Sequence, residues 1–336
     1  EMGHEIVVIT NFPNHPSGLI FKGYKNKWSS VDNYESIQIK RVFTYLTPNK
    51  GLIRRSLNYL IYMILSIYNG YKEKNIDLII STSPQLLCGL GGMILSKIKK
   101  KPHVFEIRDI WPESIASVGL IKKMNFSFKI LKLIERNIIK SADVVVTVTS
   151  GIFSYVKKYR KNNILMITNG VLISETRKLK NNNNFKKINF GYIGTIGSAH
   201  NTQIIIDAAK ILINDDKINF TIIGDGAEKD LIFRKANELK NVTTLELLLS
   251  NEVDHAYEKI DVGIVTLRND SLWIDALPTK MFDFLVREKP IILSIPNGST
   301  TNLIKDNDCG LVAKVDSAKS LVDKILFYKD NCKMIK

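Results

Sequence analysis

The stretch INFGYIGTIGSAHNTQIIIDAAKILI, residues 188–213, reads as an apolar strand, a glycine-rich turn and a helix in direct succession. The unit then repeats. Further apolar strands are expected at 218–224, 242–247, 262–267, 290–295 and 310–315, separated by helices at 226–239, 252–259, 279–287 and 317–329. Strands that are apolar almost throughout, with helices between them, predict a parallel sheet covered on both faces.

The first half of the chain follows the same scheme. Strands are expected at 5–10, 76–81, 103–108, 142–148 and 164–168, and helices at 53–72, 84–99 and 125–140. After Gly170 the apolar periodicity stops, and the polar run 178–187 contains four consecutive asparagines, a linker composition. The fold class is therefore predicted as α/β, with two doubly wound, Rossmann-like domains at 1–172 and 173–336. In tandem α/β domains a ligand lies beyond the carboxyl ends of the strands, so a cleft between the domains is the expected site.

Composition narrows the class of protein. The 336 residues are 45% apolar and 24% charged, which is typical of globular chains. The cysteines, Cys88, Cys309 and Cys332, fit neither a disulfide framework nor a metal site and favour a reducing cytoplasm. The uncharged stretch 56–71 is shorter than the ~20 apolar residues of a membrane-spanning helix.

The positive charge is concentrated in the first half. Up to Gly170 there are 25 basic and 11 acidic residues, a net charge of +14, and from Val171 onward 23 and 22, a net charge of +1. This asymmetry indicates an anionic partner of the first half, either nucleic acid or an acidic lipid surface.

The glycine-rich turn has two interpretations. Gly191, Gly194 and Gly197 lie between a strand and a helix, where backbone amides could hold a phosphate. Their spacing is G-x-x-G-x-x-G, so the dinucleotide fingerprint G-x-G-x-x-G is not met. In the other interpretation, the glycines only let the strand and the helix approach each other.

Two other strand ends carry charged residues. Asp225 and Gly226 follow the strand 218–224, where Asp225 either contacts a ligand or caps the next helix. The stretch FEIRDIWPES, residues 105–114, crowds Glu106, Arg108, Asp109 and Glu113 around a strand end. Such density beside an apolar strand indicates either a functional site or a self-satisfied pair of Arg108 with Glu113.

The stretch DALPTKMFDFLVREKPII, residues 275–292, completes a resemblance. With FEIRDIWPESIASVG, LIERNIIKSADVVVTVTSGI, GYIGTIGSAHN and IGDGAEKDLI it follows the order typical of the retaining glycosyltransferases of family 4. The resemblance covers nearly the whole chain and implies the GT-B fold of two facing Rossmann-like domains. More narrowly, the chain resembles the bacterial O-antigen and capsule subgroup that contains the L-fucosamine transferases.

The resemblance assigns residues to the donor. Asp275 and Asp283 match the two acids of the family's E-x7-E motif, with Pro278 and Pro290 in register. It implies that Asp283 binds the ribose hydroxyls and that Asp275 approaches the donor sugar. The other positions expected to contact the nucleotide sugar are Gly194, Thr195, Gly197, Asp225, Gly226, Arg268, Pro278, Thr279 and Lys280.

The sequence departs from the family at the phosphate loop. The family carries an Arg just after the glycine and a Lys five residues later, where this chain has Thr195 and His200. A departing diphosphate needs positive charge. Lys280 is therefore predicted to replace the family's Arg and Lys, and Arg268 is the second candidate. The alternative is that Lys280 is an ordinary solvent-facing lysine.

The resemblance also implies a mechanism and partners. A sugar, an N-acetylated (deoxy)hexosamine, would pass from a UDP-sugar to a polyprenyl-diphosphate-linked saccharide with retention, without a metal or other cofactor. Asp109 or Glu113 would position the acceptor hydroxyl. The basic first half suits an anionic membrane, so the expected location is the cytoplasmic face of the inner membrane, peripheral to it. The segments 51–72 and 122–136 either rest on that surface or are ordinary core helices with basic outer faces.

Other functions stay open at this point. A non-hydrolysing UDP-sugar epimerase also uses two Rossmann-like domains, and the altered phosphate loop is compatible with a non-catalytic partner subunit. Nucleic-acid binding is disfavoured, because the basic residues lack an interleaved aromatic pattern. Compared with the family, the first domain is expected to lack its opening strand and the second its final crossover helix.

Overall fold

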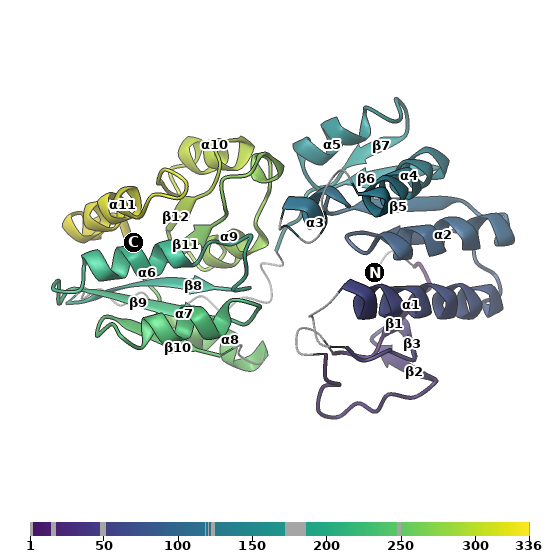
Figure 1. The fold of residues 1–336 in the computed structure, drawn as a ribbon, viewed down its shortest axis with the longest axis horizontal. Helices are drawn as coiled ribbons and strands as arrows, with labels where there is room; N and C mark the ends of the chain where they lie inside the picture. Colours follow the sequence, from purple (N-terminus) through teal and green to yellow (C-terminus); the bar gives the residue numbers. More distant parts are fainter. Residues whose placement is uncertain are drawn as a thin grey trace. The chain divides into compact units, whose positions relative to one another are not determined.

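The structure is a computed structural model, and it describes residues 3–14, 18–47, 52–117, 119, 121, 125–171, 186–246 and 250–335. The chain forms two compact units, Glu1–Thr168 and Asn169–Lys336, called here the first and second domains. The predicted boundary between residues 172 and 173 lies outside the described residues. Figure 1 shows each domain as strands flanked by helices.

The second domain is built on one parallel sheet. Its strands are β8 (Ile188–Ile193), β9 (Ile218–Ile223), β10 (Val242–Leu245), β11 (Val262–Thr266), β12 (Ile291–Ser294) and β13 (Gly310–Val312). The order across the sheet is β10-β9-β8-β11-β12-β13. The chain therefore winds outward from β8 in one direction and then from β11 in the other. This is the Rossmann order, and ligands bind beyond the carboxyl ends of the strands where the direction reverses.

Helices cover both faces of this sheet. One core cluster joins the sheet to α6 (Gln203–Ile211), α7 (Lys229–Ala236) and α11 (Ala318–Asp330). A second joins it to α8 (Ser250–Glu258), α9 (Thr279–Leu285) and α10 (Ser299–Asp306). The strands are buried on both faces, which explains why their sequences are apolar without alternation.

A glycine in β11 fixes the position of α9. The ring of Phe284 lies so close to Gly263 that a Cβ there would be 2.6 Å from its Cγ. Phe284 is fully buried and packs edge-on against Tyr257, with ring centroids 4.9 Å apart. The absence of a side chain at Gly263 thus lets α9 pack close to the end of the central strands.

The first domain contains a second parallel sheet. Its strands are β4 (Ile79–Thr82), β5 (His103–Ile107), β6 (Val144–Thr147) and β7 (Ile164–Met166), in the order β4-β5-β6-β7. The helices are α1 (Leu52–Lys72), α2 (Leu86–Lys99), α3 (Glu113–Ser117), α4 (Phe126–Ser141) and α5 (Ser150–Val156). The core of this sheet is formed with α2, α4 and α5.

A three-stranded sheet accompanies it. β1 (Ile6–Asn11) pairs in parallel with β3 (Ile37–Val42), which pairs antiparallel with β2 (Ser29–Tyr34). The antiparallel pair was not predicted. β1 and β4 belong to separate sheets, and both line a cavity of about 150 Å³ together with α1 and α2. The expectation that the first domain lacks an opening strand stays a prediction.

The predicted fold class is confirmed. Parallel sheets with helices occur in both domains, and each strand predicted in the two halves appears within a few residues of its expected place. The helices α3, α5 and α10 and the strands β2 and β3 were missed.

Candidate active site

The glycine-rich turn after β8 interlocks with the turn after β9. Gly194 has φ of +142°, and its N–H donates to the carbonyl of Ile223 at 2.9 Å. The N–H of Ile196 donates to the carbonyl of Asp225 at 2.8 Å. The Gly194 N–H is therefore already hydrogen-bonded within the protein, which is contrary to its predicted role in phosphate binding. The amides of Thr195 and Gly197 have no partner among the described residues and are free for a ligand.

The glycines of the second turn are required by the backbone. Gly224 and Gly226 have φ of +156° and +146°, and a Cβ on either would overlap the backbone of the first turn. The backbone at Gly224 and Gly226 thus lets the two turns approach each other closely. Asp225 does not cap α7: its Oδ1 accepts from the N–H of Gly226 at 2.8 Å, and the N-cap residue of α7 is Glu228.

We predict that Gly224→Ala lowers the unfolding free energy by roughly 2 kcal/mol or more, because the new Cβ meets rigid backbone and the φ is strained. Gly197→Ala is the matched control, since only the Thr195 Cγ2, at 3.9 Å, lies near its Cβ. Denaturant titration of both variants measures the difference. Equal stability of the two variants would contradict the interlocked geometry.

Lys280 lies against the first turn. It belongs to the first turn of α9, and its Nζ would be 3.1 Å from a Cβ on Gly194. The Nζ donates to the hydroxyl of Tyr192 at 2.8 Å and lies 4.2 Å from the centre of that ring. The Tyr192 hydroxyl in turn donates to the carbonyl of Thr195 at 2.6 Å. The alternative of a solvent-facing lysine is wrong.

The ammonium group of Lys280 is buried without a counter-charge. Burial lowers its pKa to about 7. Among the described residues, no carboxylate forms an ion pair with it. An ammonium carries three N–H donors and Tyr192 accepts one, so two donors remain for an anion.

His200 adds no positive charge to this place. Its pKa is lowered to about 3, first by burial and then by the charge of Lys280, so the imidazole is neutral at physiological pH. Its Nδ1 is buried and has no hydrogen-bond partner in the described chain. The positive charge at the turn therefore comes from Lys280.

Arg268 lies in the loop after β11. Its N–H donates to the carbonyl of Ala199 at 2.9 Å, which ties this loop to the glycine-rich turn. Its guanidinium lies 3.8 Å from a carboxylate oxygen of Glu228, and half of the side chain is exposed. Arg268 is thus near the turn but already paired.

The two predicted acids occupy different surroundings. Asp283 lies on α9, where burial raises the pKa of its carboxyl and the charge of Arg287 partly offsets this. Its carboxylate makes no ion pair with a described residue. Asp275 accepts from the Ser299 hydroxyl at 3.2 Å. Pro278 is the N-cap residue of α9 and Thr279 follows it, exposed.

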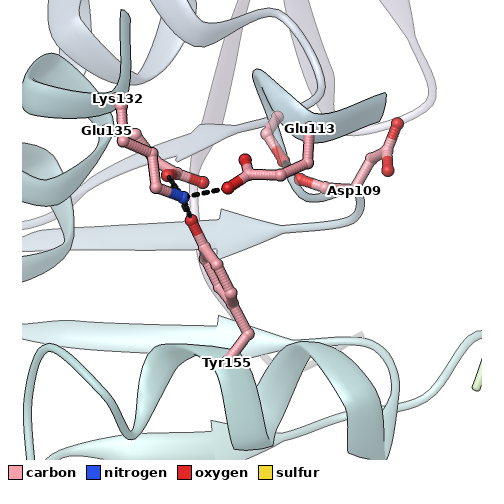
Figure 2. Close-up of polar contacts among 6 residues, drawn as sticks. Asp109, Glu113, Lys132, Glu135 and Tyr155 are labelled. Atoms are coloured by element: carbon pink, nitrogen blue, oxygen red, sulfur yellow. Dashed lines mark hydrogen bonds and ion pairs between the residues drawn. The ribbon is translucent and has the colours of Figure 1, made fainter. Parts of the chain in front are cut away.

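A second polar cluster lies in the first domain. Figure 2 shows the ammonium group of Lys132 between the carboxylates of Glu113 and Glu135 and the hydroxyl of Tyr155, with Asp109 on the far side of Glu113. The Tyr155 hydroxyl also donates to Glu135 Oε2 at 2.5 Å. Helices α3, α4 and α5 thus meet at one ammonium group.

Burial dominates the ionisation of this cluster. It raises the pKa of Glu135 to about 8 against the opposing effect of Lys132, and Glu135 is 2% exposed. It also raises the pKa of Asp109 to about 6, which hydrogen bonds from Ser114 and Ile110 partly offset. A carboxyl with a pKa near the working pH is suited to exchanging a proton with a ligand.

The predicted alternative pair of Arg108 with Glu113 is wrong. Arg108 is exposed, while Glu113 forms its ion pair with Lys132. The sequence separation explains the error, because Lys132 comes from a helix 19 residues further along.

Comparison with known proteins matches both domains to glycosyltransferase families. Residues 1–175 match the model of Glycosyltransferase Family 4, and residues 174–334 match that of the group 1 glycosyl transferases. The chain belongs to Glycosyltransferase Family 4. A curated relative, the probable glycosyltransferase WbjE of Pseudomonas aeruginosa, is 22% identical over 280 residues, which are 79% of this chain and 69% of WbjE.

Solved structures show the fold of this family-4 glycosyltransferase. Sucrose-phosphate synthase from Thermosynechococcus elongatus aligns with a TM-score of 0.74 at 12% identity, over 99% of this chain and 82% of that one. Anabaena HepE in complex with UDP-glucose aligns with a TM-score of 0.64 at 15% identity, over 86% and 77%. The expected GT-B fold is confirmed.

Sequence reasoning missed several residues that contact the candidate site residues of this glycosyltransferase. Tyr192 sits in a buried strand, where a tyrosine is ordinary, so nothing local points to its contact with Lys280. Lys132 and Glu135 lie on α4, and Tyr155 lies on α5. The i, i+3 spacing of Lys132 and Glu135 was a readable signal for an ion pair but not for its burial.

The described parts of this glycosyltransferase were also searched for membrane-spanning helices and for metal sites. None of the helices in the described ranges is both long and apolar enough to span a bilayer. Within the same ranges, no three His, Cys, Asp or Glu side chains come together as ligands for a metal ion.

Proposed function

We propose that this glycosyltransferase moves an N-acetylated (deoxy)hexosamine from a UDP-sugar to a polyprenyl-diphosphate-linked saccharide, with retention of the anomeric configuration, in O-antigen, capsule or exopolysaccharide synthesis. The donor binds the second domain, and the acceptor hydroxyl is positioned by the first. A UDP-sugar donor is supported by the similarity in fold to Anabaena HepE, whose structure was solved in complex with UDP-glucose.

The buried ammonium group of Lys280 carries this proposal. A charge taken out of water is costly unless an opposite charge accompanies it. The Lys280 Nζ has two free N–H donors and lies against Gly194, at the carboxyl end of β8 where the sheet order reverses. A diphosphate at this place would supply the missing counter-charge.

The reaction then needs little from the protein beyond position and charge. The bond between the anomeric carbon and the diphosphate oxygen breaks, and a bond to the acceptor oxygen forms. The hydroxyl proton passes to an oxygen of the leaving diphosphate. Lys280 stabilises the developing negative charge, with the amides of Thr195 and Gly197, so no metal ion is required for that task.

The two acids of the second domain bind neutral hydroxyls in this proposal. Asp283, without an ion-pair partner among the described side chains, accepts from the ribose hydroxyls. Asp275 approaches the donor sugar from beside Ser299. An ionised carboxylate only accepts hydrogen bonds, so beside a diphosphate these two acids bind sugar hydroxyls, while Lys280 binds the phosphate oxygens.

The membrane surface is proposed from the outer faces of α1 and α4. Five large apolar side chains of α1 are exposed at helical spacing, namely Leu57, Leu60, Ile64, Tyr68 and Tyr71. Phe126, Ile130 and Leu133 form a similar stripe on α4, with exposures of 78%, 42% and 55%. Apolar side chains next to lysines suit the interface of an anionic bilayer. The free thiols of Cys88, Cys309 and Cys332 suit a reducing, cytoplasmic face.

We predict that the protein floats with phosphatidylglycerol vesicles at low salt and that Ile64→Asp combined with Phe126→Asp removes it from the lipid fraction. Both side chains are more than half exposed, so the fold should tolerate the change. Neutral phosphatidylcholine vesicles are the control for charge. If the wild-type protein separates from the phosphatidylglycerol vesicles and stays at the bottom of the gradient, the proposed membrane surface is refuted.

The proposed function is tested by calorimetry with UDP, followed by incubation of UDP-N-acetyl sugars with a lipid-diphosphate-linked sugar. A product heavier by one sugar, formed only with the acceptor present, is the expected result. Conversion of the UDP-sugar without acceptor would indicate an epimerase. No binding at millimolar UDP would indicate a non-catalytic partner subunit.

A further inference from the structure

Arg287 is a buried cation that joins the end of α9 to α8. It follows Val286, the C-cap residue of α9, and only 8% of its side chain is exposed. Its Nε and Nη2 both donate to Oδ1 of Asp254 on α8, at 3.2 and 2.6 Å. Its Cζ also lies 4.2 Å from the centre of the Tyr257 ring, on the same helix. Two residues of α8 thus fix the guanidinium group in place.

The same guanidinium group caps the end of α9. Its Nη1 donates to the main-chain carbonyl of Asp283, in the last turn of that helix, at 2.8 Å. The last carbonyls of a helix lack partners within the helix, and a positive charge at this end is favourable. Arg287 therefore ties the backbone of Asp283 to α8.

The carboxylate of Asp283 has no partner in the described chain. It is half-buried, and no described residue donates a hydrogen bond to it or forms an ion pair with it. The side chains that interact with it electrostatically are Arg287 and, on α8, Tyr257. Burial raises the pKa of this carboxyl, and the charge of Arg287 lowers it. Arg287 thus favours the ionised form, which accepts hydrogen bonds from hydroxyl groups.

The spacing on α9 places Asp283 next to Lys280. Residues three apart on a helix lie on one face, with their Cβ atoms about 5–6 Å apart. Lys280 lies against Gly194, where the diphosphate is proposed to bind. A ribose bonded to that diphosphate can therefore reach Asp283, one turn further along α9.

We propose that Arg287 is a positioning residue for the donor: it holds the Asp283 carboxylate toward the ribose hydroxyls, with Asp254 and Tyr257 as its anchor. The inference rests on the proposed function for the contact between Asp283 and the ribose. Arg287 acts through Asp283 and not on the nucleotide, since its side chain is enclosed by α8 and α9. Selectivity for a ribose with both hydroxyls thus depends on a residue that the nucleotide does not contact.

The test is calorimetry of the full chain with UDP and with 2′,3′-dideoxy-UDP, which lacks both ribose hydroxyls. The wild-type protein should bind UDP about tenfold or more tightly than the dideoxy nucleotide, the effect of a hydrogen bond to a charged group. Arg287→Met should lose most of this ratio, because its affinity for UDP falls while its affinity for dideoxy-UDP stays nearly unchanged. A purely structural loss would weaken both nucleotides alike and would keep the ratio.

Further variants keep the test decisive if Arg287→Met does not fold. Asp254→Asn removes the ion pair at a residue whose side chain is 31% exposed, and it should lower the ratio in part. Arg287→Lys keeps the charge without the second contact and should restore part of the ratio. Asp283→Ala should abolish the ratio, and adding Arg287→Met to it should cause no further loss, as for two residues that act through one contact.

Arg234→Met is the matched control, because Arg234 is an exposed arginine in the last turn of α7. It should keep the wild-type ratio. The inference is overturned if Arg287→Met binds UDP more weakly but keeps the wild-type ratio, or if the wild-type protein binds both nucleotides equally. In either case UDP still binds, so the proposed function stands. No binding of UDP at millimolar concentration would overturn the proposed function and this inference with it.

Discussion

Replacing Lys280 by methionine is expected to stabilise the ligand-free protein and, at the same time, to remove its binding of UDP. Methionine fills a similar volume against the Tyr192 ring without a buried charge. We expect a gain of about 1–4 kcal/mol in unfolding free energy at pH 7, as in other replacements of buried charges by apolar residues. Affinity for UDP and the rate of transfer should fall about 100-fold or more.

The stability effect has a defined pH dependence. The pKa of Lys280 is lowered from 10.5 to about 7 in the folded protein. Between these values the unfolded chain binds more protons than the folded one, so the stability of the wild-type protein rises with pH. Lys280→Met should lose this rise, and its advantage should therefore shrink as the pH approaches 10.

Lys259→Met is the matched control, because this exposed lysine of the same domain has no ion-pair partner among the described residues. Chemical denaturation between pH 6 and 10 measures both variants. A Lys280→Met protein that is less stable than the wild-type protein at pH 7 would show that the ammonium group is satisfied in the free protein.

Glu135→Gln is expected to be tolerated at acidic pH and to stabilise the first domain at alkaline pH. The pKa of Glu135 is raised from 4.5 to about 8 in the folded state, chiefly by burial. Between these values the folded protein binds the extra proton, so its stability falls as the pH rises. Glutamine resembles the protonated acid, and above pH 8 the variant should be more stable by about 3 kcal/mol or more.

Lys132→Met provides the opposite result. It leaves Glu113 and Glu135 together without their ammonium partner, which should cost about 3–5 kcal/mol. Thermal unfolding across pH 5 to 9 checks both variants. If Glu135→Gln shows the same pH dependence as the wild-type protein, Glu135 does not carry the proton in the folded state.

Sequence patterns predicted the parallel sheets well because those strands are buried on both faces. Most strands from β8 to β13 are short apolar runs, each followed by a helix or a loop, and such runs can be recognised from the sequence alone. The strand β2, SSVDNY, is polar and mostly exposed, so it has no such run. β3 did carry a signal, since Ile37 and Ile39 alternate with Gln38 and Lys40, as in a half-buried strand.

The candidate site was predictable where it depends on a motif and not where it depends on tertiary contacts. Lys280 was identified because the glycine-rich turn lacks the basic residues that a diphosphate needs. Its partner Tyr192 lies 88 residues away in the chain, and no local rule brings them together. The cluster around Lys132 likewise joins three helices.

Calorimetry of UDP binding at pH 8 in two buffers of different ionisation enthalpy tests the central claim most directly. Lys280 is largely neutral in the free protein at this pH, and a diphosphate against it should restore its charge. The wild-type protein should take up close to one proton on binding UDP, and Lys280→Met should bind weakly without proton uptake. Equal affinity of the two proteins, with no difference between the buffers, would contradict the assignment of Lys280 to the diphosphate.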